Sequence, residues 1–455
     1  MSVRAAAFYI CLLAGVPSLV AEPPREPSVA DYGTIHEAVD KHRGHMVYVP
    51  AGDYTISAKI AIRGDGSGLF GPGRIIQTSI EQPIVEVESA ADARLDGLTL
   101  IRPDGAQETR FEAVVATGCR DVTLDNLTIV DNRSSAAAIA LRECVGGRVR
   151  GCRIVNYMRV FVDDRTTSDL YGYAFRCIDG SGIVATYGKR IVIEGNQIVE
   201  RHLLPTRDVQ RQFELGKFVK KNATKGTLVS QKVWDDGSVN NWHQGSAIVV
   251  TAPEISNAIQ ILGNTIENAA QGIDLHADHV IVANNVINNA FIGMKAMHGS
   301  RNVLIIGNQF SKNDLWAIGL MPGAASHAAS PASGDVQARE ANRDGGSIIA
   351  NNIISDFGYG HAHWIWAEAN CFPIRFDTGQ EADDPPLSNV VVQGNLVDDT
   401  GGEGVLVDGT PTVSPPRYKY AVYVPTGDRA PKNLHFSNNL LHSGTEGVSN
   451  IPLDP

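Results

Sequence analysis

The sequence lacks several features that would point to common classes of protein. After residue 21 it has no apolar run of the roughly 20 residues that a membrane-spanning helix needs. Basic residues are in deficit, with 39 Lys and Arg against 50 Asp and Glu, which gives a net charge of −11. A general nucleic-acid-binding surface is therefore not expected. No Cys-x-x-Cys or Cys/His spacing indicates a zinc site.

The N-terminal segment has the three parts of a secretory leader. Arg4 provides a positive charge, residues 5–20 form an apolar stretch, and Ala21 is a small residue at a cleavage point. Residues 1–21 are predicted to be a signal peptide and 22–455 a single secreted or periplasmic domain. A membrane anchor is the alternative, but the apolar stretch is short and a Pro-rich polar segment follows it. The five cysteines outside the leader are an odd number, and buried thiols are expected.

A short internal repeat organises the chain. Between Ile259 and Phe310, aliphatic runs end three times in Gly-Asn or Asn-Asn, and the second Asn of each pair follows the last by 21 and 23 residues. A repeat of this length, with β-type alternation inside each unit, predicts a solenoid of short strands. Seven Asn occupy one repeat position and are predicted to form an internal, purely structural ladder: Asn196, Asn264, Asn285, Asn308, Asn352, Asn395 and Asn439.

The start of the domain predicts a cap for such a solenoid. Thr34 and Glu37 form a capping-box pattern that begins an amphipathic helix from Ile35 to about His42. The strand pair VYVPAGDYTI follows. This combination resembles the start of right-handed parallel β-helix proteins of the pectate-lyase-like superfamily. The resemblance implies an all-β, right-handed parallel β-helix with an N-terminal capping helix and long loop insertions.

The repeat is interrupted by long segments. Inserts are expected at about 156–179, 201–244, 322–346, 366–388 and 408–432. Long loops in a compact fold are usually functional or disordered. These inserts leave the coil on both sides of one strand face and predict a cleft there.

That strand face carries a dense group of titratable residues. Alternation directs Asp274 and His276 outward, and Lys295 is expected beside Asp274 on the next coil. Met297 falls beside His276, with His298 just beyond. We interpret Asp274, His276, Lys295 and His298 as an acid/base site. The alternative is a solvated Asp–Lys pair with ordinary surface histidines.

The sequence Gly-Ile-Asp-Leu-His ending at His276 resembles the Asp-Pro-His strand motif of mannuronan C5-epimerases. Asp274 and His276 match the motif, Leu275 replaces its Pro, and Lys295 stands where a basic residue is expected. The resemblance implies abstraction of the C5 proton of a uronate.

The insert at 201–244 reverses the acidic character of the chain, and such a local excess of basic charge can steer a polyanion. A solubilising loop is the alternative. The residues predicted to bind substrate are Arg211, Lys217, Lys220, Lys221, Lys225, Trp234, Trp242 and His243 of this insert, together with Trp316.

These observations predict a lyase that cleaves an acidic polysaccharide. Lys295 or His276 would take the C5 proton, the other residue or His298 would protonate the leaving oxygen, and Asp274 would orient them. A C5-epimerase shares the first step. A hydrolase would need two carboxylates, and Asp274, Asp278, Glu267 and Asp314 could supply such a pair. A non-catalytic carbohydrate-binding adhesin is the alternative from another class. No Asp cluster matches the calcium site of pectate lyases, which leaves a calcium requirement open.

Overall fold

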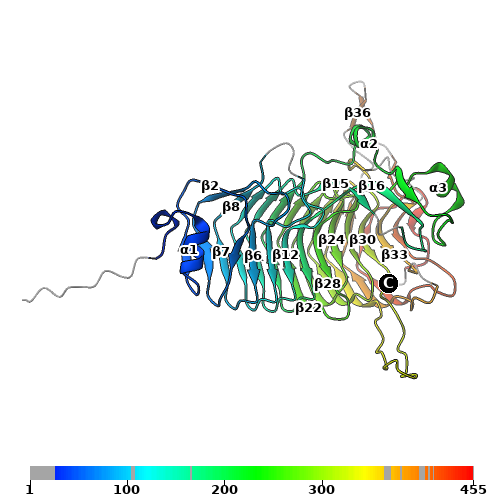
Figure 1. The fold of residues 1–455 in the computed structure, drawn as a ribbon. Coiled ribbons are helices and arrows are strands. Elements are labelled where there is room, and N and C mark those ends of the chain that lie inside the picture. Colours follow the sequence, from blue (N-terminus) through cyan, green and yellow to red (C-terminus); the bar gives the residue numbers. More distant parts are fainter. Residues whose placement is uncertain are drawn as a thin grey trace, which may run out of the picture.

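The computed structural model describes residues 26–103, 108–163, 167–362, 370–379, 382–398, 405–407, 410–412 and 415–453. The predicted signal peptide at 1–21 lies outside these residues. Three parallel sheets of 12 strands each wind around one axis, so that each coil of the chain adds one strand to each sheet (Figure 1). The solenoid of strands expected from the repeat is confirmed, and so is the all-β parallel β-helix that the resemblance implies.

The strands of each sheet are in chain order. The first sheet contains β1 (Met46–Tyr48), β4 (Gly68–Phe70), β7 (Arg94–Asp96), β10 (Thr123–Asp125), β13 (Arg148–Arg150), β18 (Val192–Glu194), β22 (Asn257–Leu262), β25 (Asp278–Ala283), β28 (Arg301–Ile306), β31 (Gly345–Ala350), β34 (Ser388–Gln393) and β39 (Lys432–Ser437). The second contains β2 (Asp53–Ile56), β5 (Arg74–Gln77), β8 (Thr99–Ile101), β11 (Thr128–Val130), β14 (Arg153–Val155), β19 (Gln197–Val199), β23 (Thr265–Glu267), β26 (Val286–Asn288), β29 (Gln309–Ser311), β32 (Ile353–Ser355), β35 (Leu396–Asp398) and β40 (Leu440–Leu441). The third contains β3 (Ile60–Ile62), β6 (Val85–Glu88), β9 (Val114–Thr117), β12 (Ala137–Arg142), β17 (Ser181–Thr186), β21 (Ser246–Thr251), β24 (Gln271–Leu275), β27 (Ile292–Ala296), β30 (Trp316–Leu320), β33 (Phe372–Phe376), β38 (Tyr420–Tyr423) and β41 (Gly447–Ser449).

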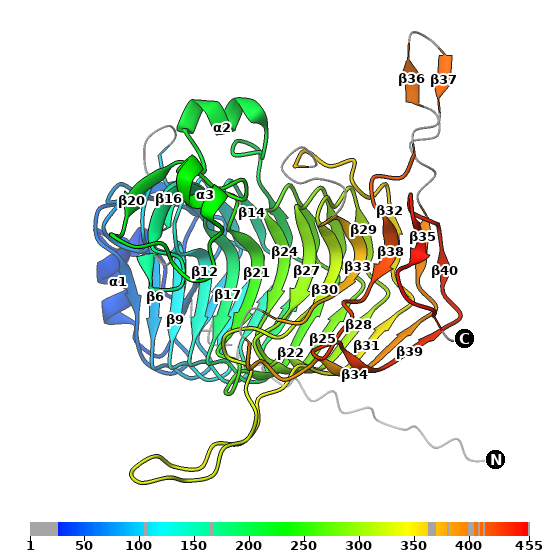
Figure 2. The same ribbon diagram turned by 90° about the vertical axis from the view of Figure 1, so that its right-hand side faces the viewer.

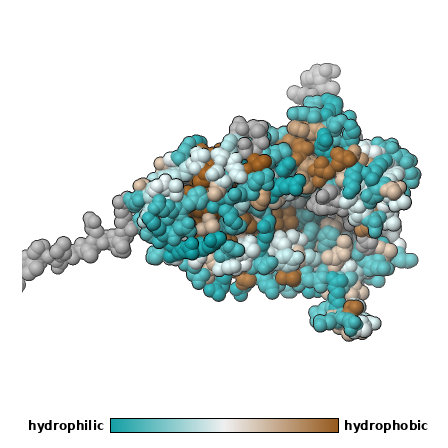
Figure 3. All heavy atoms as spheres, viewed as in Figure 1, coloured by the Kyte–Doolittle hydropathy of each residue, from teal (hydrophilic) through white to brown (hydrophobic). Residues whose placement is uncertain are grey.

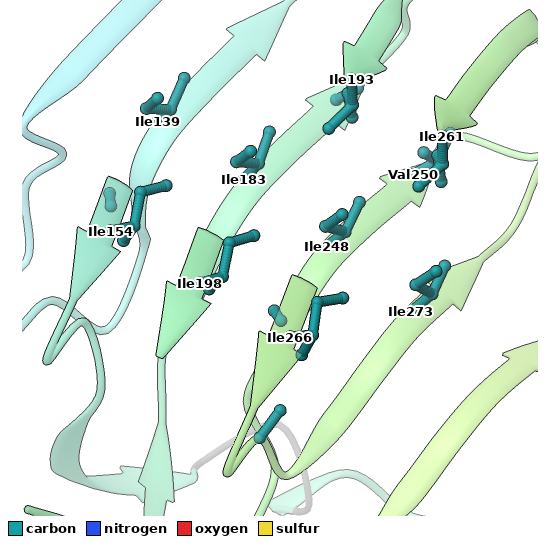
Figure 4. Packing of buried hydrophobic residues seen from close by; sticks show 14 of the residues in the cluster. Ile139, Ile154, Ile183, Ile193, Ile198, Ile248, Val250, Ile261, Ile266 and Ile273 are labelled. Atoms are coloured by element: carbon teal, nitrogen blue, oxygen red, sulfur yellow. The ribbon is translucent and has the colours of Figure 1, made fainter. Parts of the chain in front are cut away.

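Columns of β-branched residues fill the interior. Figure 4 shows Ile183, Ile248 and Ile273 stacked on successive strands of the third sheet, and all three are fully buried. Burying one such side chain contributes about 1.5–3 kcal/mol. Because the same position is apolar on every coil, the core grows along the axis with the number of coils.

The predicted Asn ladder lies inside the turns between the first and second sheets. Nδ2 of Asn264 donates to Oδ1 of Asn285 at 2.9 Å, and Nδ2 of Asn285 donates to Oδ1 of Asn308 at 2.9 Å. The same contact continues through the other members to Asn439. From Asn264 onward, each Oδ1 also accepts the backbone N–H of the preceding Asn, and Oδ1 of Asn285 accepts that of Asn264 at 2.9 Å. The ladder therefore satisfies buried polar groups, as predicted.

The N-terminal cap also forms as predicted. Helix α1 (Ile35–Lys41) begins after Thr34, whose Oγ1 accepts the backbone N–H of Glu37 at 3.1 Å. Ahead of it lies a short 3-10 helix, η1 (Val29–Asp31). Helix α1 lies at the N-terminal end of the solenoid (Figure 1). The five cysteines expected to be core thiols are all buried: Cys119, Cys144, Cys152, Cys177 and Cys371.

Additional structure lies beside the coils. Strands β15 (Arg159–Asp163), β16 (Tyr173–Asp179) and β20 (Phe218–Lys221) form a separate antiparallel sheet, and helices α2 (Arg207–Phe213) and α3 (Gln231–Asp236) accompany it. Figure 2 shows these elements beside the third sheet, near its β12 to β21 strands. In Figure 3 apolar side chains gather on this insert, and the surface is hollowed below it.

Two of the expected inserts are shorter than predicted. The range 366–388 contains β33 and the range 408–432 contains β38, and both are strands of the third sheet. Outside the sheets, β36 (Val405–Val407) pairs with β37 (Thr410–Thr412), and residues 327–342 form an extended two-stranded arm. The arm projects away from the solenoid (Figure 2). None of the helices in the described part of the chain has the length and apolar character needed to cross a membrane.

Candidate functional site

The outer face of the third sheet changes character along the solenoid axis. Strand register aligns one row of outward positions: Ala140, Val184, Val249, Asp274, Lys295, Gly319, Arg375 and Tyr423. The row is apolar up to Val249 and becomes charged at Asp274. The residues on either side of Asp274 in β24, Ile273 and Leu275, are fully buried. Alternation therefore points Asp274 outward, as the sequence predicts.

Asp274 is the centre of the charged part of the row. Its Oδ2 lies 3.4 Å from Nζ of Lys295 on the adjacent strand, and its Oδ1 lies 2.9 Å from Nε2 of His276. The side chain of Asp274 is only 11% exposed. Burial acts to raise the pKa of Asp274, but the charges of Lys295 and His276 outweigh it and hold that pKa well below its usual range. Asp274 is thus ionised at neutral pH.

His276 is held from both sides. Besides the contact of Nε2 with Asp274, its Nδ1 lies 3.2 Å from Oγ1 of Thr251 on β21. Its ring meets that of His298 edge to face, with the centroids 4.4 Å apart. Both of its nitrogens therefore lie close to oxygen atoms of the protein. His276 is suited to fixing the positions of Asp274 and His298.

His298 lies on a strained turn that other residues brace. Its φ of 60° is in the left-handed region, which non-glycine residues rarely adopt. Asp344 accepts the N–H groups of the next two residues, Gly299 at 3.0 Å and Ser300 at 3.1 Å, and Nδ2 of Asn342 donates to the carbonyl of His298 at 3.1 Å. Three buried hydrogen bonds therefore hold the turn that presents the imidazole.

The imidazole of His298 is neutral at physiological pH. Burial, followed by the nearby charges of His276 and Lys295, lowers its pKa to about 4. Its Nδ1 has no hydrogen-bond partner among the described residues, and Gly323 packs so closely that a Cβ there would lie 2.4 Å from Nδ1. The other ring nitrogen, Nε2, is then the one available to a ligand. A neutral imidazole beside an ammonium and a carboxylate can accept a proton.

Beyond Lys295 the face carries a cationic and aromatic cluster that sequence reasoning missed in part. Cζ of Arg375 lies 4.9 Å from the ring centroid of Trp316, and the rings of Phe372 and Tyr423 stack with centroids 4.5 Å apart. Asp377 accepts from Nε and Nη2 of Arg375. The alternation Phe-Pro-Ile-Arg-Phe is the signal that places Arg375 on a strand and not in the insert expected at 366–388.

The structure contradicts two of the predicted substrate contacts. Trp242 is fully buried and belongs to the core, and His243 is 1% exposed. Burial lowers the pKa of His243 to about 4. Both residues belong to the segment that anchors the insert, where His243 bridges to Ile178 of β16. An aromatic residue in a long insert can serve as the insert's own core, which the sequence pattern alone did not separate from a sugar-binding position.

The basic residues of the insert contact the insert itself. Lys217 pairs with Glu214 at 2.8 Å, and Lys225 donates to the carbonyl of Val229 at 2.7 Å. Nζ of Lys221 donates to the carbonyl of Trp234 and also lies 4.8 Å from its ring centroid. Arg211 pairs with Asp208. Among the described residues, none of these contacts reaches Asp274, so a role of Arg211, Lys217, Lys220, Lys221, Lys225 or Trp234 in binding stays a prediction.

The carboxylates proposed as hydrolase partners lie elsewhere. Asp278 is on β25 of the first sheet, where it pairs with Arg301 at 3.0 Å, and Glu267 is on β23 of the second sheet. Asp314 is buried and accepts the N–H groups of residues 360 and 362. Within the described ranges, no three His, Cys, Asp or Glu side chains are placed to hold a metal ion.

Comparison with known proteins identifies the architecture. Residues 85–310 match the family described as right handed beta helix region. Among solved structures the chain is similar to a hyperthermoactive exopolygalacturonase from Thermotoga maritima (TM-score 0.56, 11% identity, 92% of each chain covered) and to the Dettilon tailspike protein (TM-score 0.55, 12% identity, 91% of this chain and 64% of that chain). It is also similar to a mannuronan C-5 epimerase A-module from Azotobacter vinelandii (TM-score 0.45, 14% identity, 94% of this chain and all of that one). No curated protein matches the sequence. Identities this low show a shared fold alone.

Proposed function

We propose that this chain, a right-handed parallel β-helix of the pectate-lyase-like type, cleaves a uronate-containing polysaccharide by β-elimination. The observation that carries the proposal is the grouping of Lys295 and His298 around Asp274. One partly buried face presents an ammonium, a neutral imidazole and a single ionised carboxylate. Removal of a proton next to a carboxylate needs a base and a nearby cation, and this face offers both.

The reaction divides between two side chains. His298 accepts the C5 proton of the uronate at Nε2, and the electron pair of the C5–H bond becomes the C4–C5 double bond. The C4–O bond breaks as this happens, and the ammonium of Lys295 donates a proton to the leaving oxygen. Asp274 attracts the ammonium and fixes its position, while His276 links Asp274 to the ring of His298. Asp274 and His276 thus act as positioning residues.

The spacing of carboxylates supports elimination over hydrolysis. Asp344 lies beside the turn of His298, but it is buried and its oxygens accept from two backbone N–H groups and from Oγ of Ser326. Asp377 follows β33, three strands from β24, so its backbone is about 14 Å from that of Asp274. Glycosidases place their two carboxyl groups about 5–9.5 Å apart.

One experiment tests the reaction class. Purified protein is incubated with polymannuronate, polyguluronate and polygalacturonate in separate assays, while ultraviolet absorbance, reducing ends and viscosity are followed together. Elimination creates a double bond conjugated to the carboxylate, so absorbance should rise in step with falling viscosity. New reducing ends without absorbance would show a hydrolase and overturn the roles of His298 and Lys295. Solvent deuterium entering C5 of an uncut chain would show an epimerase, which shares only the proton abstraction.

Binding without any turnover would identify a carbohydrate-binding protein instead of an enzyme. The gathering of four titratable side chains within contact distance of one another supports catalysis over this alternative. A secreted or periplasmic location would give such an enzyme access to its polymer, and the proposed leader at 1–21 supports that location.

A further inference from the structure

The outer row of the third sheet places a second cation beyond the acid/base group. Lys295 on β27 is followed by Gly319 on β30 and then by Arg375 on β33. Gly319 has no side chain, and the ring of Trp316 packs against it. The backbones of the two cations are two strand spacings or about 10 Å apart. In the other direction from Asp274 the row holds Val249 and then Val184. Charge suited to an anionic ligand therefore lies only on the Arg375 side of this row.

The guanidinium of Arg375 is held rigidly. Oδ2 of Asp377 accepts from its Nε at 3.1 Å and from its Nη2 at 2.6 Å. Its Cζ lies 4.9 Å from the ring centroid of Trp316, 5.7 Å from that of Phe372 and 5.8 Å from that of Tyr423. The side chain is 20% exposed. A planar group fixed by aromatic rings and one carboxylate loses little conformational entropy when it binds a further partner.

The hydrogen-bonding capacity of this cluster is incomplete. Within the described ranges of the chain, Nη1 of Arg375 has no hydrogen-bond partner, and the buried Nε1 of Trp316 has no acceptor. Because Nε1 of Trp316 is buried and the Arg375 side chain is partly exposed, Nη1 of Arg375 is the donor that can reach a ligand oxygen. Gly319 is needed for the arrangement, since a Cβ at this position would lie 2.8 Å from a ring carbon of Trp316.

We propose that Arg375 is a specificity-determining residue that binds the carboxylate of an acidic sugar seated beside the ring of Trp316, which covers Gly319. This sugar is the neighbour of the one that reacts between Lys295 and His298. The inference rests on the proposed function and extends it, because it requires two adjacent acidic sugars in the substrate. A polymer in which acidic and neutral sugars alternate would leave Arg375 without its partner.

The test compares Arg375→Gln and Arg375→Lys with the parent. The matched control is Arg150→Gln, because Arg150 forms the same two-point pair with Asp125 on the first sheet. The KM and kcat are measured by ultraviolet absorbance with hexamers of mannuronate, guluronate and galacturonate. The Kd of the same hexamers and of their carboxyl-reduced forms is measured by calorimetry in a His298→Gln background, which slows turnover.

Loss of a charge-assisted hydrogen bond should raise KM and Kd about 10- to 100-fold in Arg375→Gln, with kcat changed less than about threefold. Arg375→Lys should fall between this variant and the parent, and carboxyl-reduced hexamers should bind the parent and Arg375→Gln equally. Arg150→Gln should behave as the parent. If Arg375→Gln does not fold, the KM of Arg375→Lys serves as the test of the proposal. Loss of the planar guanidinium alone should raise this KM above that of the parent.

Unchanged KM and Kd in a variant that folds would overturn the role of Arg375 while elimination by the parent stands. If the parent forms no unsaturated product yet binds the hexamers, and Arg375→Gln weakens that binding, the Arg375 site is supported and the proposed reaction fails. A parent that neither binds nor cleaves any of the hexamers would overturn both.

Discussion

Asp274 and Lys295 face each other across adjacent strands, with Oδ2 of the carboxylate 3.4 Å from Nζ of the ammonium. They are 21 residues apart in sequence, which is one coil of the solenoid. Two residues that are one repeat apart in the sequence are therefore in contact in the structure.

Replacing Lys295 tests its role as the residue that donates a proton to the leaving oxygen. In Lys295→Ala the leaving oxygen loses its proton donor and the carboxylate of the uronate loses its nearest cation, so kcat should fall at least about 10²-fold. Lys432→Ala is the control, because Lys432 is an exposed cation on β39 of the first sheet. Circular dichroism and thermal unfolding check that both variants fold. Parent-like turnover by folded Lys295→Ala would remove Lys295 from the mechanism.

Replacing His298 tests the base through the pH profile. The pKa of His298 is lowered to about 4, so the neutral base predominates above that pH and is lost as the pH falls through it. The parent's kcat/KM should therefore decline below about pH 4. His298→Gln should lose about 10²-fold or more at neutral pH, and its residual rate should lack this acid limb. A parent profile that declines on the acid side near pH 6.5 would instead indicate an unperturbed histidine as the base.

The insert lysines should separate into two kinds. Lys225 is tied to the insert backbone by two hydrogen bonds, so Lys225→Ser should lower the insert's resistance to proteolysis. Lys220 is exposed, and Lys220→Ser should raise KM for a polyuronate modestly at low salt while kcat is kept. Screening should remove this effect at high salt. A KM that does not depend on Lys220 at low salt would mean that the insert does not attract substrate.

Repetition explains which parts of the molecule could be predicted. The solenoid, the Asn ladder and the Asp274–Lys295 contact all follow from one position recurring once per coil, so they are readable in the sequence. The role of a residue in an insert cannot be read from its type alone, because it has no equivalent in the other coils. Trp242 was expected to contact sugar and is instead core, because an insert must bury something to be ordered.

Arg375 was missed for a related reason. Its strand follows a coil in which residues 322–346 leave the solenoid, so the count along the chain no longer gives the register. Only the pairing of Gly319 with Arg375 shows that the latter belongs to the same row as Asp274. The hydrogen bonds by which Asp344 holds the turn of His298 could not be predicted from a local sequence pattern either, because 45 residues separate Asp344 from Gly299.

A single substitution in the Asn ladder should lower the free energy of unfolding more than a substitution of an exposed polar residue does. Asn285→Ala removes the acceptor of Asn264 Nδ2 and the donor to Asn308, leaving buried groups unpaired. We expect a loss of roughly 2–4 kcal/mol in the free energy of unfolding, from at least two unmet buried groups at about 1–3 kcal/mol each. Gln309→Ala, at an exposed position on the neighbouring strand β29, should change stability by less than about 0.5 kcal/mol. Chemical denaturation of both variants measures the difference.

His243 should make the stability of the protein depend on pH. Its pKa is lowered by burial to about 4 in the folded protein, against about 6.5 in an unfolded chain. Between these values the unfolded chain binds a proton that the folded protein does not, so stability falls as the pH drops from 6.5 to 4, by on the order of 3 kcal/mol. Asp314 and Asp344 have the opposite effect on stability. Burial raises the pKa of each to about 7, so the folded protein holds these protons more tightly than the unfolded chain does. The stability that this adds is lost as the pH rises toward and through 7.

A comparison with His243→Phe isolates the histidine from these opposing groups. The difference in unfolding free energy, parent minus variant, should become more negative from pH 7.5 to pH 4.5, because phenylalanine does not titrate. His435→Gln, at an exposed position, should show no such trend. Guanidinium unfolding at four pH values measures both differences. If the difference for His243→Phe stays constant across that range, the imidazole is protonated in the folded protein as readily as in the unfolded chain, and His243 is not sealed in the core.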